Sequence, residues 1–313
     1  MQLSLSVKDK SIETSGITKD YKEALCEFIW NSFEANATEV EISYTKNELS
    51  GINTISISDN GDGIVYEDIA DTFGTFLASK KNSLSLMKSK ANKGKGRFSF
   101  TAIASEATWK TVYKQGDNYL LFNIFLSNSN KNLVDYNDPK ISDEKETGTT
   151  ITLSNIIDLL PENISMLHLE DTLLKEYAWF LYLNKNDDYR IIINGEKLDY
   201  SKYINVELSQ EKTIIIEDYS FSLNLIVWLD KIKEKYCSYY LDSSDTVKGK
   251  DTTTFNRNTM NYNHSMFVCS EFFNHLDDIS LDSISAQTGF YLSLDDQRII
   301  KELKKEIHNL IQN

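Results

Sequence analysis

The sequence has few of the residues that build disulfide frameworks or metal centres. Its three cysteines, Cys26, Cys237 and Cys269, lie far apart and form no Cys-x-x-Cys pair. This pattern disfavours a disulfide framework or a zinc site and predicts a reducing, cytoplasmic environment. The four histidines stand at no metal-ligand spacing, so we interpret them as ordinary residues.

Long apolar runs and proline-rich linkers are also missing. No stretch of about 18 apolar residues occurs, so the sequence predicts no membrane-spanning helix. The N-terminal segment MQLSLSVKDKSIETSG lacks a charged region followed by an apolar stretch, and we therefore expect no secretion signal. The 313 residues, of which 41% are hydrophobic and two are proline, are typical of a globular protein with two domains.

Positive charge is scarce overall but concentrated in one segment. The formal net charge is −14, which disfavours a protein that coats nucleic acid, because such affinity comes largely from Lys and Arg. Residues 80–97 nevertheless hold seven basic side chains and no acidic one. This segment is either a solvated loop or a segment that meets an anion, and its Gly94-Lys95-Gly96 ending favours the second interpretation.

Hydrophobic periodicity predicts an α+β protein with helices on one face of an antiparallel or mixed sheet. Helices are expected at 19–36, around 66–78, at 98–106, at 169–184 and from about Leu294 to the C-terminal region. Strands are expected at 39–45, 52–59, 107–114, 118–127 and 148–153, in a hairpin at 189–200, and in three segments from 213, 221 and 235.

Two predicted elements bring polar residues together. Glu27 and Asn31 are four residues apart on the first helix, so both project from one face. Asp59 follows Ile55 and Ile57 at period two and therefore points inward. A buried carboxylate needs a donor, and the amino group of an adenine ring is one that it can accept.

Other ligand motifs fit the sequence less well. The DNGDG segment at 59–63 resembles a calcium loop, but with Gly63 at position 6, Ser58 and Ile69 fall where that loop needs Asp and Glu. A strand is also expected before this segment, where a calcium loop has a helix. Neither G-x-x-x-x-G-K-[ST] nor G-x-G-x-x-G occurs in the chain. Calcium and those two phosphate-binding motifs are therefore rejected.

Four segments resemble, in order, the motifs of the GHKL ATPase superfamily, which includes DNA gyrase, heat-shock-90 chaperones, histidine kinases and MutL. Residues 27–37 resemble the first motif, and 59–64 resemble the second, D-x-G-x-G. Residues 94–99 resemble the glycine-rich end of the ATP lid, and 148–151 resemble the fourth motif, a Gly-Thr on a strand. The resemblance covers about residues 15–200 and implies a Bergerat-type layered α/β sandwich.

The resemblance also implies roles for single residues, with ATP and Mg²⁺ as ligands. Glu27 would be the general base that deprotonates the attacking water, and Asn31 would coordinate magnesium. Asp59 would accept the adenine amino group, helped by Thr149 through a shared water. The residues implied to bind the nucleotide are Asp59, Gly61, Gly63, Ile64, Gly94, Lys95, Gly96, Arg97, Phe98 and Thr149.

Within that set, the glycine-rich segment is expected to hold the phosphates. Gly94, Gly96 and the backbone amides near Phe98 would do so as a helix N-terminus can. The side chains of Lys95 and Arg97 either add positive charge there or point to solvent. The basic segment 80–97 then becomes a lid over the triphosphate.

The resemblance is nearest to bacterial heat-shock-90-like or MORC-like ATPases. It implies an ATP-binding domain at 1–203 and a smaller transducer-like α/β domain at 204–313, from which Lys248, Lys250 or Arg257 would reach the γ-phosphate. The implied function is a slow magnesium-dependent ATPase that acts as an ATP-gated homodimerisation switch. An ATP-binding regulatory subunit without turnover, and the ATPase half of a DNA-repair or anti-phage complex, remain alternatives, and a protein partner stays open. Residues 156–313 carry 16 basic and 26 acidic side chains, a net −10, which disfavours direct binding of nucleic acid.

Overall fold

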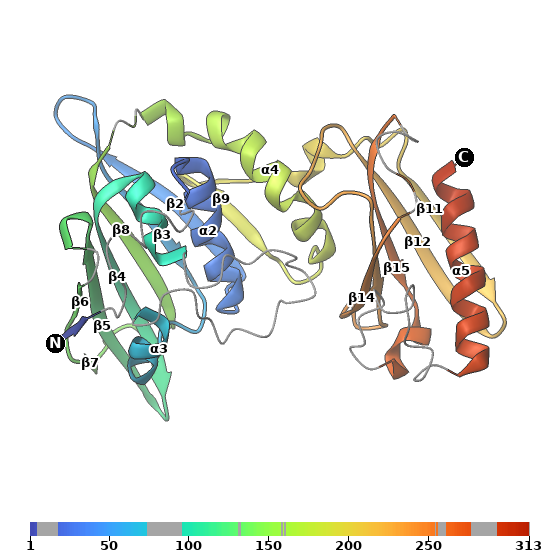
Figure 1. Ribbon diagram of the computed structural model, residues 1–313, viewed down its shortest axis with the longest axis horizontal. Coiled ribbons are helices and arrows are strands. Elements are labelled where there is room, and N and C mark those ends of the chain that lie inside the picture. Colours follow the sequence, from blue (N-terminus) through green and yellow to red (C-terminus); the bar gives the residue numbers. More distant parts are fainter. Residues whose placement is uncertain are drawn as a thin grey trace. The chain divides into compact units, whose positions relative to one another are not determined.

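The computed structural model describes residues 1–4, 18–73, 96–130, 133–157, 159, 161–253, 255, 261–276 and 293–312. These residues form two compact units, each built on one β-sheet (Figure 1). The first unit holds the described residues up to Leu173 together with Asn186–Leu198. The second holds Leu174–Lys185 and the described residues from Asp199 onward. A domain boundary at residue 204 stays a prediction.

The sheet of the first unit is mostly antiparallel and runs in the order β1-β6-β5-β4-β8-β3-β2-β9-β10, with β7 paired to β5. Strands β2 and β9 form a parallel pair. The strands are β1 Gln2–Ser4, β2 Glu39–Lys46, β3 Ile52–Asp59, β4 Ala104–Gln115, β5 Asn118–Ser127, β6 Leu133–Tyr136, β7 Lys140–Ile141, β8 Gly148–Ile156, β9 Arg190–Ile193 and β10 Glu196–Lys197.

Helix α2 (Tyr21–Glu34) packs against β2 and β3 of this sheet (Figure 1). The carboxylate of Asp20 caps its N-terminus by accepting a 2.8 Å hydrogen bond from the backbone N–H of Lys22. Its apolar stripe is buried, as are alternate residues of the two strands. The other helical segments of this unit are η1 Tyr66–Asp68, α3 Ile69–Phe73, η2 Gly96–Ala102, η3 Asn128–Asn130 and η4 Pro161–Ile164. Helix α4 spans Met166–Leu183, and its residues up to Leu173 belong to this unit.

The sheet of the second unit runs in the order β11-β12-β15-β13-β14. Helix α5 (Leu294–Gln312) covers one face, where it packs along β11 and β12 through a shared apolar core (Figure 1). The ring of Trp179, in the second half of α4, stacks on Tyr239 with centroids 5.5 Å apart. The strands and short helices are η5 Tyr200–Tyr203, β11 Gln210–Ile216, β12 Tyr219–Trp228, β13 Cys237–Leu241, β14 Val247–Thr252, β15 Asn263–Cys269 and η6 Glu271–His275.

The α+β class expected from periodicity is confirmed, and a second, smaller sheet follows the first. The Asn194-Gly195 turn joins β9 and β10 with both residues at positive φ, as a two-residue hairpin requires. The helix expected at 98–106 is confirmed in its first part and wrong in its last: the 3-10 helix η2 ends at Ala102, and β4 begins at Ala104, which pairs with Ile156 of β8. None of the helices in the described ranges has the length and apolar character that crossing a bilayer would require.

Candidate functional site

Asp59 ends strand β3, and three donors fix its carboxylate. Its Oδ1 accepts hydrogen bonds from the backbone N–H groups of Gly61 (3.0 Å) and Thr149 (3.1 Å). Its Oδ2 accepts one from the hydroxyl of Ser32, at 2.9 Å. Ile55 and Ile57 are buried as expected, so the strand delivers the carboxylate to the side that faces α2. Helix α2, strand β8 and the loop after β3 thus meet at one anionic group.

The loop that follows Asp59 lies against the backbone of its neighbours. A Cβ at Gly61 would lie 2.5 Å from the carbonyl oxygen of Ala35, and a Cβ at Gly63 would lie 2.2 Å from that of Val112. Gly63 also has φ +77°, a region that residues with a side chain rarely adopt. These two glycines therefore let the loop pack on α2 and β4. Their contact with a ligand stays a prediction.

Two threonine hydroxyls extend the polar cluster behind this loop. Thr149 and Thr111 face each other in the β4–β8 ladder with their Oγ1 atoms 3.1 Å apart, and both are buried. The Oγ1 of Thr111 accepts a 2.8 Å hydrogen bond from the backbone N–H of Ile64. The sequence reasoning missed Thr111 because its place beside Thr149 depends on strand register.

Glu27 and Asn31 lie half-buried on α2, one turn apart, between buried neighbours. This placement agrees with the shared face expected from their spacing. Ser32, the residue after Asn31, is the buried member of the helix that reaches Asp59. Helix α2 therefore presents the Glu27 carboxylate and the Asn31 amide on one side, and its Ser32 supports the Asp59 carboxylate.

The segment expected to hold phosphates is described only in its last part. Gly96 begins η2, which packs against α2, and Phe98 is fully buried. Gly94 and Lys95, with the rest of the expected lid, lie outside the described residues, and so does the side chain of Arg97. The role of these residues stays a prediction.

The basic residues suggested for the γ-phosphate have acidic partners within the second unit. The ammonium of Lys250 pairs with the carboxylate of Glu234, and that of Lys248 lies 3.6 Å from Asp242. Arg257 lies outside the described residues. In the described ranges, no three His, Cys, Asp or Glu side chains gather as a metal site would need.

Comparison with known proteins gives a family match and similarity to MutL proteins. Residues 19–150 match the model of the histidine kinase-, DNA gyrase B- and HSP90-like ATPases. The DNA mismatch repair protein MutL of Ehrlichia chaffeensis is 25% identical over 240 residues, which are 73% of this chain and 33% of that protein. The chain therefore spans about a third of the length of this relative.

Among solved structures, the ATPase domain of Aquifex aeolicus MutL complexed with ADP is similar at 12% identity and a TM-score of 0.39. The match covers 81% of this chain and 92% of that one. The family match covers α2, the β3 loop and the Gly148-Thr149 strand start, which are the elements that meet at Asp59. Residues 19–150 are therefore similar to the histidine kinase-, DNA gyrase B- and HSP90-like ATPases, which form the GHKL superfamily.

Proposed function

We propose that the chain binds ATP with Mg²⁺ at the Asp59 cluster, hydrolyses it slowly, and acts as an ATP-gated conformational switch. The observation that carries this proposal is the Asp59 carboxylate, which Ser32, Gly61 and Thr149 hold in one orientation. A carboxylate fixed in this way is a preorganised acceptor for a donor of matching geometry.

The chemistry of the cluster suits adenine better than guanine. Adenine carries an amino donor at the position where guanine carries a carbonyl acceptor. Asp59 would accept from that amino group, whereas the guanine oxygen would face a carboxylate and repel it. The Thr149 hydroxyl, already in contact with Thr111, adds a second polar group at the same place.

The α2 residues fit the metal and the reaction. The amide oxygen of Asn31 is the kind of ligand that Mg²⁺ accepts while it keeps water and phosphate oxygens in its shell. Mg²⁺, when bound, would neutralise charge on the phosphate oxygens. Glu27 would orient a water molecule and accept its proton as that water attacks the γ-phosphate.

Titration calorimetry and phosphate release test this proposal. We expect an ATP analogue to bind in the presence of Mg²⁺, a GTP analogue to bind far more weakly, and phosphate to be released slowly from ATP. Binding without phosphate release would favour the regulatory ATP-binding subunit. Equal affinity for both nucleotides would contradict the assignment of Asp59 as the base reader.

The switch part of the proposal concerns assembly. We expect a monomer or loose association without nucleotide and a homodimer with a non-hydrolysable ATP analogue, as ATP-gated closure requires. Light scattering with and without the analogue measures this directly. The same mass in both states would remove the switch and leave the ATPase proposal standing.

A second candidate, the ATPase part of a DNA-repair machine, is favoured by the similarity to the mismatch repair protein over 73% of the chain. The net charge of −14 opposes direct DNA binding by this chain. Fluorescence anisotropy with labelled duplex DNA at low salt separates this candidate from the ATP-gated switch. Salt-sensitive binding would support the DNA-repair candidate.

A further inference from the structure

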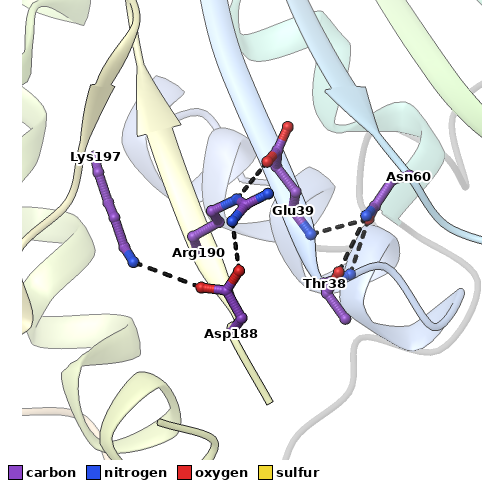
Figure 2. Close-up of polar contacts among 6 residues, drawn as sticks. All are labelled: Thr38, Glu39, Asn60, Asp188, Arg190 and Lys197. Atoms are coloured by element: carbon purple, nitrogen blue, oxygen red, sulfur yellow. Dashed lines mark hydrogen bonds and ion pairs between the residues drawn. The ribbon is translucent and has the colours of Figure 1, made fainter. Parts of the chain in front are cut away.

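The side-chain amide of Asn60 makes hydrogen bonds through both its oxygen and its nitrogen to one short segment, the Thr38–Glu39 turn. Its Oδ1 accepts hydrogen bonds from the backbone N–H groups of Thr38 and Glu39, both at 2.9 Å. Its Nδ2 donates to the hydroxyl of Thr38 at 3.0 Å (Figure 2). Thr38 lies between α2 and β2, and Glu39 begins β2. The backbone N–H of Asn60 also donates to the carbonyl of Glu39 at 3.4 Å, so the side chain adds three hydrogen bonds to this one backbone tie between the end of β3 and the chain that leaves α2.

The same turn is held from its other side by strand β9. The backbone N–H of Arg190 donates to the carbonyl of Thr38 at 2.8 Å. The guanidinium of Arg190 pairs with the carboxylate of Glu39 (Figure 2). Asp188 accepts from the same guanidinium at 2.5 Å. These contacts raise the pKa of Arg190, mainly through the hydrogen bond to Glu39. The residues that Asn60 contacts are therefore also bound to β9, on the side away from the loop.

Two further contacts join the loop to the end of α2. The backbone N–H of Asp62 donates to the carbonyl of Ala35 at 2.8 Å, and the amide of Asn36 donates to the Asp62 carboxylate at 2.5 Å. Asn60 thus lies between the Asp59 carboxylate and a second attachment point at Asp62. Any shift of the backbone at residue 60 would move both.

We propose that Asn60 is a positioning residue, which fixes the Asp59 carboxylate relative to α2 by anchoring the loop to the Thr38–Glu39 turn. This inference rests on the proposed function of the Asp59 cluster. Asn60 itself would not touch the nucleotide. It would set adenine affinity and selectivity through Asp59, and it would keep the base-reading loop in register with Glu27 and Asn31 on α2.

The test compares Asn60→Ala with Asn60→Asp and with a matched control. Asn60→Asp keeps an oxygen acceptor for the two backbone N–H groups. The control is Asn47→Ala, because Asn47 Oδ1 also accepts from two backbone N–H groups, those of Leu49 and Gly51, at the opposite end of the β2–β3 pair. Amide hydrogen exchange without nucleotide and calorimetry with ATP and GTP analogues are the two readouts.

In Asn60→Ala we expect exchange to accelerate about tenfold at Gly61, Asp62 and Thr149, none of which donates to Asn60. We expect affinity for the ATP analogue to fall about tenfold, with a smaller preference over the GTP analogue, as when groups that orient a site are removed. Asn60→Asp should restore both readouts, and Asn47→Ala should change neither. A purely structural role would lower stability without changing the preference for ATP.

Unchanged exchange at those three amides in Asn60→Ala would overturn the proposal, and so would an equal effect of Asn47→Ala. If the wild-type protein bound no nucleotide, the proposed function would fail, while the exchange data would still decide whether Asn60 positions the loop. If Asn60→Ala does not fold, Thr38→Val removes the acceptor of Asn60 Nδ2. Hydrogen exchange at the same three amides should then accelerate several-fold. Unchanged exchange in Thr38→Val would contradict the proposal.

Discussion

The hydroxyl of Ser32 lies 2.9 Å from Oδ2 of Asp59, so a side chain of α2 contacts the carboxylate at the end of β3, 27 residues further along the chain. The other oxygen of that carboxylate accepts from the backbone of Gly61 and Thr149. The orientation of Asp59 therefore depends on three separate elements. The charge of the Asp59 carboxylate and the packing of the loop that follows it can be tested by separate variants.

Asp59→Asn tests the charge. We expect this change to abolish binding of an ATP analogue, a loss of about 100-fold or more, because the amide loses the charge and can present its N–H₂ to the adenine amino group. Calorimetric titration measures it. The matched control is Asp242→Asn in the second unit, since Asp242 Oδ1 also accepts from two backbone N–H groups, those of Ser244 and Thr246. Near wild-type affinity in Asp59→Asn would exclude Asp59 as the base reader.

Gly63→Ala tests the close approach of the loop to β4. The residue has φ +77°, and its added Cβ would lie 2.2 Å from the carbonyl oxygen of Val112. We expect the free energy of unfolding to fall by about 2 kcal/mol or more. Gly116→Ala is the control, because Gly116 has φ +60° and nothing within 4 Å of the added Cβ, so it should cost only about 1 kcal/mol. Equal losses in urea unfolding would show that the approach to Val112 does not matter.

Local sequence patterns predicted the elements that carry the site, but not the contacts between them. The period-two run Ile55-Ile57-Asp59 placed the carboxylate correctly because strand alternation is a local property. The contact of Ser32 with Asp59 depends on how α2 packs on the sheet, and the contact of Thr111 with Thr149 depends on strand register. Neither is encoded by spacing along the chain.

The same limit explains the errors elsewhere. Residues 104–106 were expected in a helix, yet they extend β4 because β8 offers them a pairing partner. The sequence places Asn60 in the segment 59–63 between Asp59 and Gly61 and indicates no partner for its side chain. Its hydrogen bonds to Thr38 and Glu39, on which the proposed anchoring rests, depend on how the fold brings these residues together.

The second unit contains a buried histidine that should make its stability depend on pH. His264 in β15 is fully buried, and burial lowers its pKa to about 4. Above its usual pKa of about 6.5 the imidazole is neutral in both states. As the pH falls from about 6.5 to 4, the unfolded chain takes up a proton that the folded protein does not, so stability is lost across this window. The loss attributable to His264 should reach about 3 kcal/mol at the acidic end.

His264→Phe isolates this effect. The substituted ring can still pack between Tyr236 and Tyr262, and Thr253, the partner of His264 Nε2, retains its contact with the carbonyl of Phe255. Urea unfolding of both proteins from pH 7.5 to pH 4.5, about the range of the titration, gives the difference. We expect the variant to lose less stability on acidification than the wild type. Parallel curves would show that His264 does not contribute.

The most discriminating prediction separates binding from chemistry on one helix. Glu27 and Asn31 are both half-buried and one turn apart on α2. Glu27→Ala should bind ATP with Mg²⁺ nearly normally and lose about 10²–10⁴ in the rate of phosphate release, because a general base acts on water. Asn31→Ala should instead lose Mg²⁺-dependent binding itself.

Melting temperatures measured beside binding and phosphate release provide the control. If the two residues only support the helix, both variants should melt early and lose binding together, since they occupy equivalent positions on one face. If Glu27→Ala keeps full hydrolysis, Glu27 is not the base, and water must be activated by another group or not at all. Tight binding of ATP with no phosphate release from the wild-type protein would instead favour an ATP-binding subunit without useful turnover, in which Asp59 is fixed for binding and Glu27 has no reaction to assist.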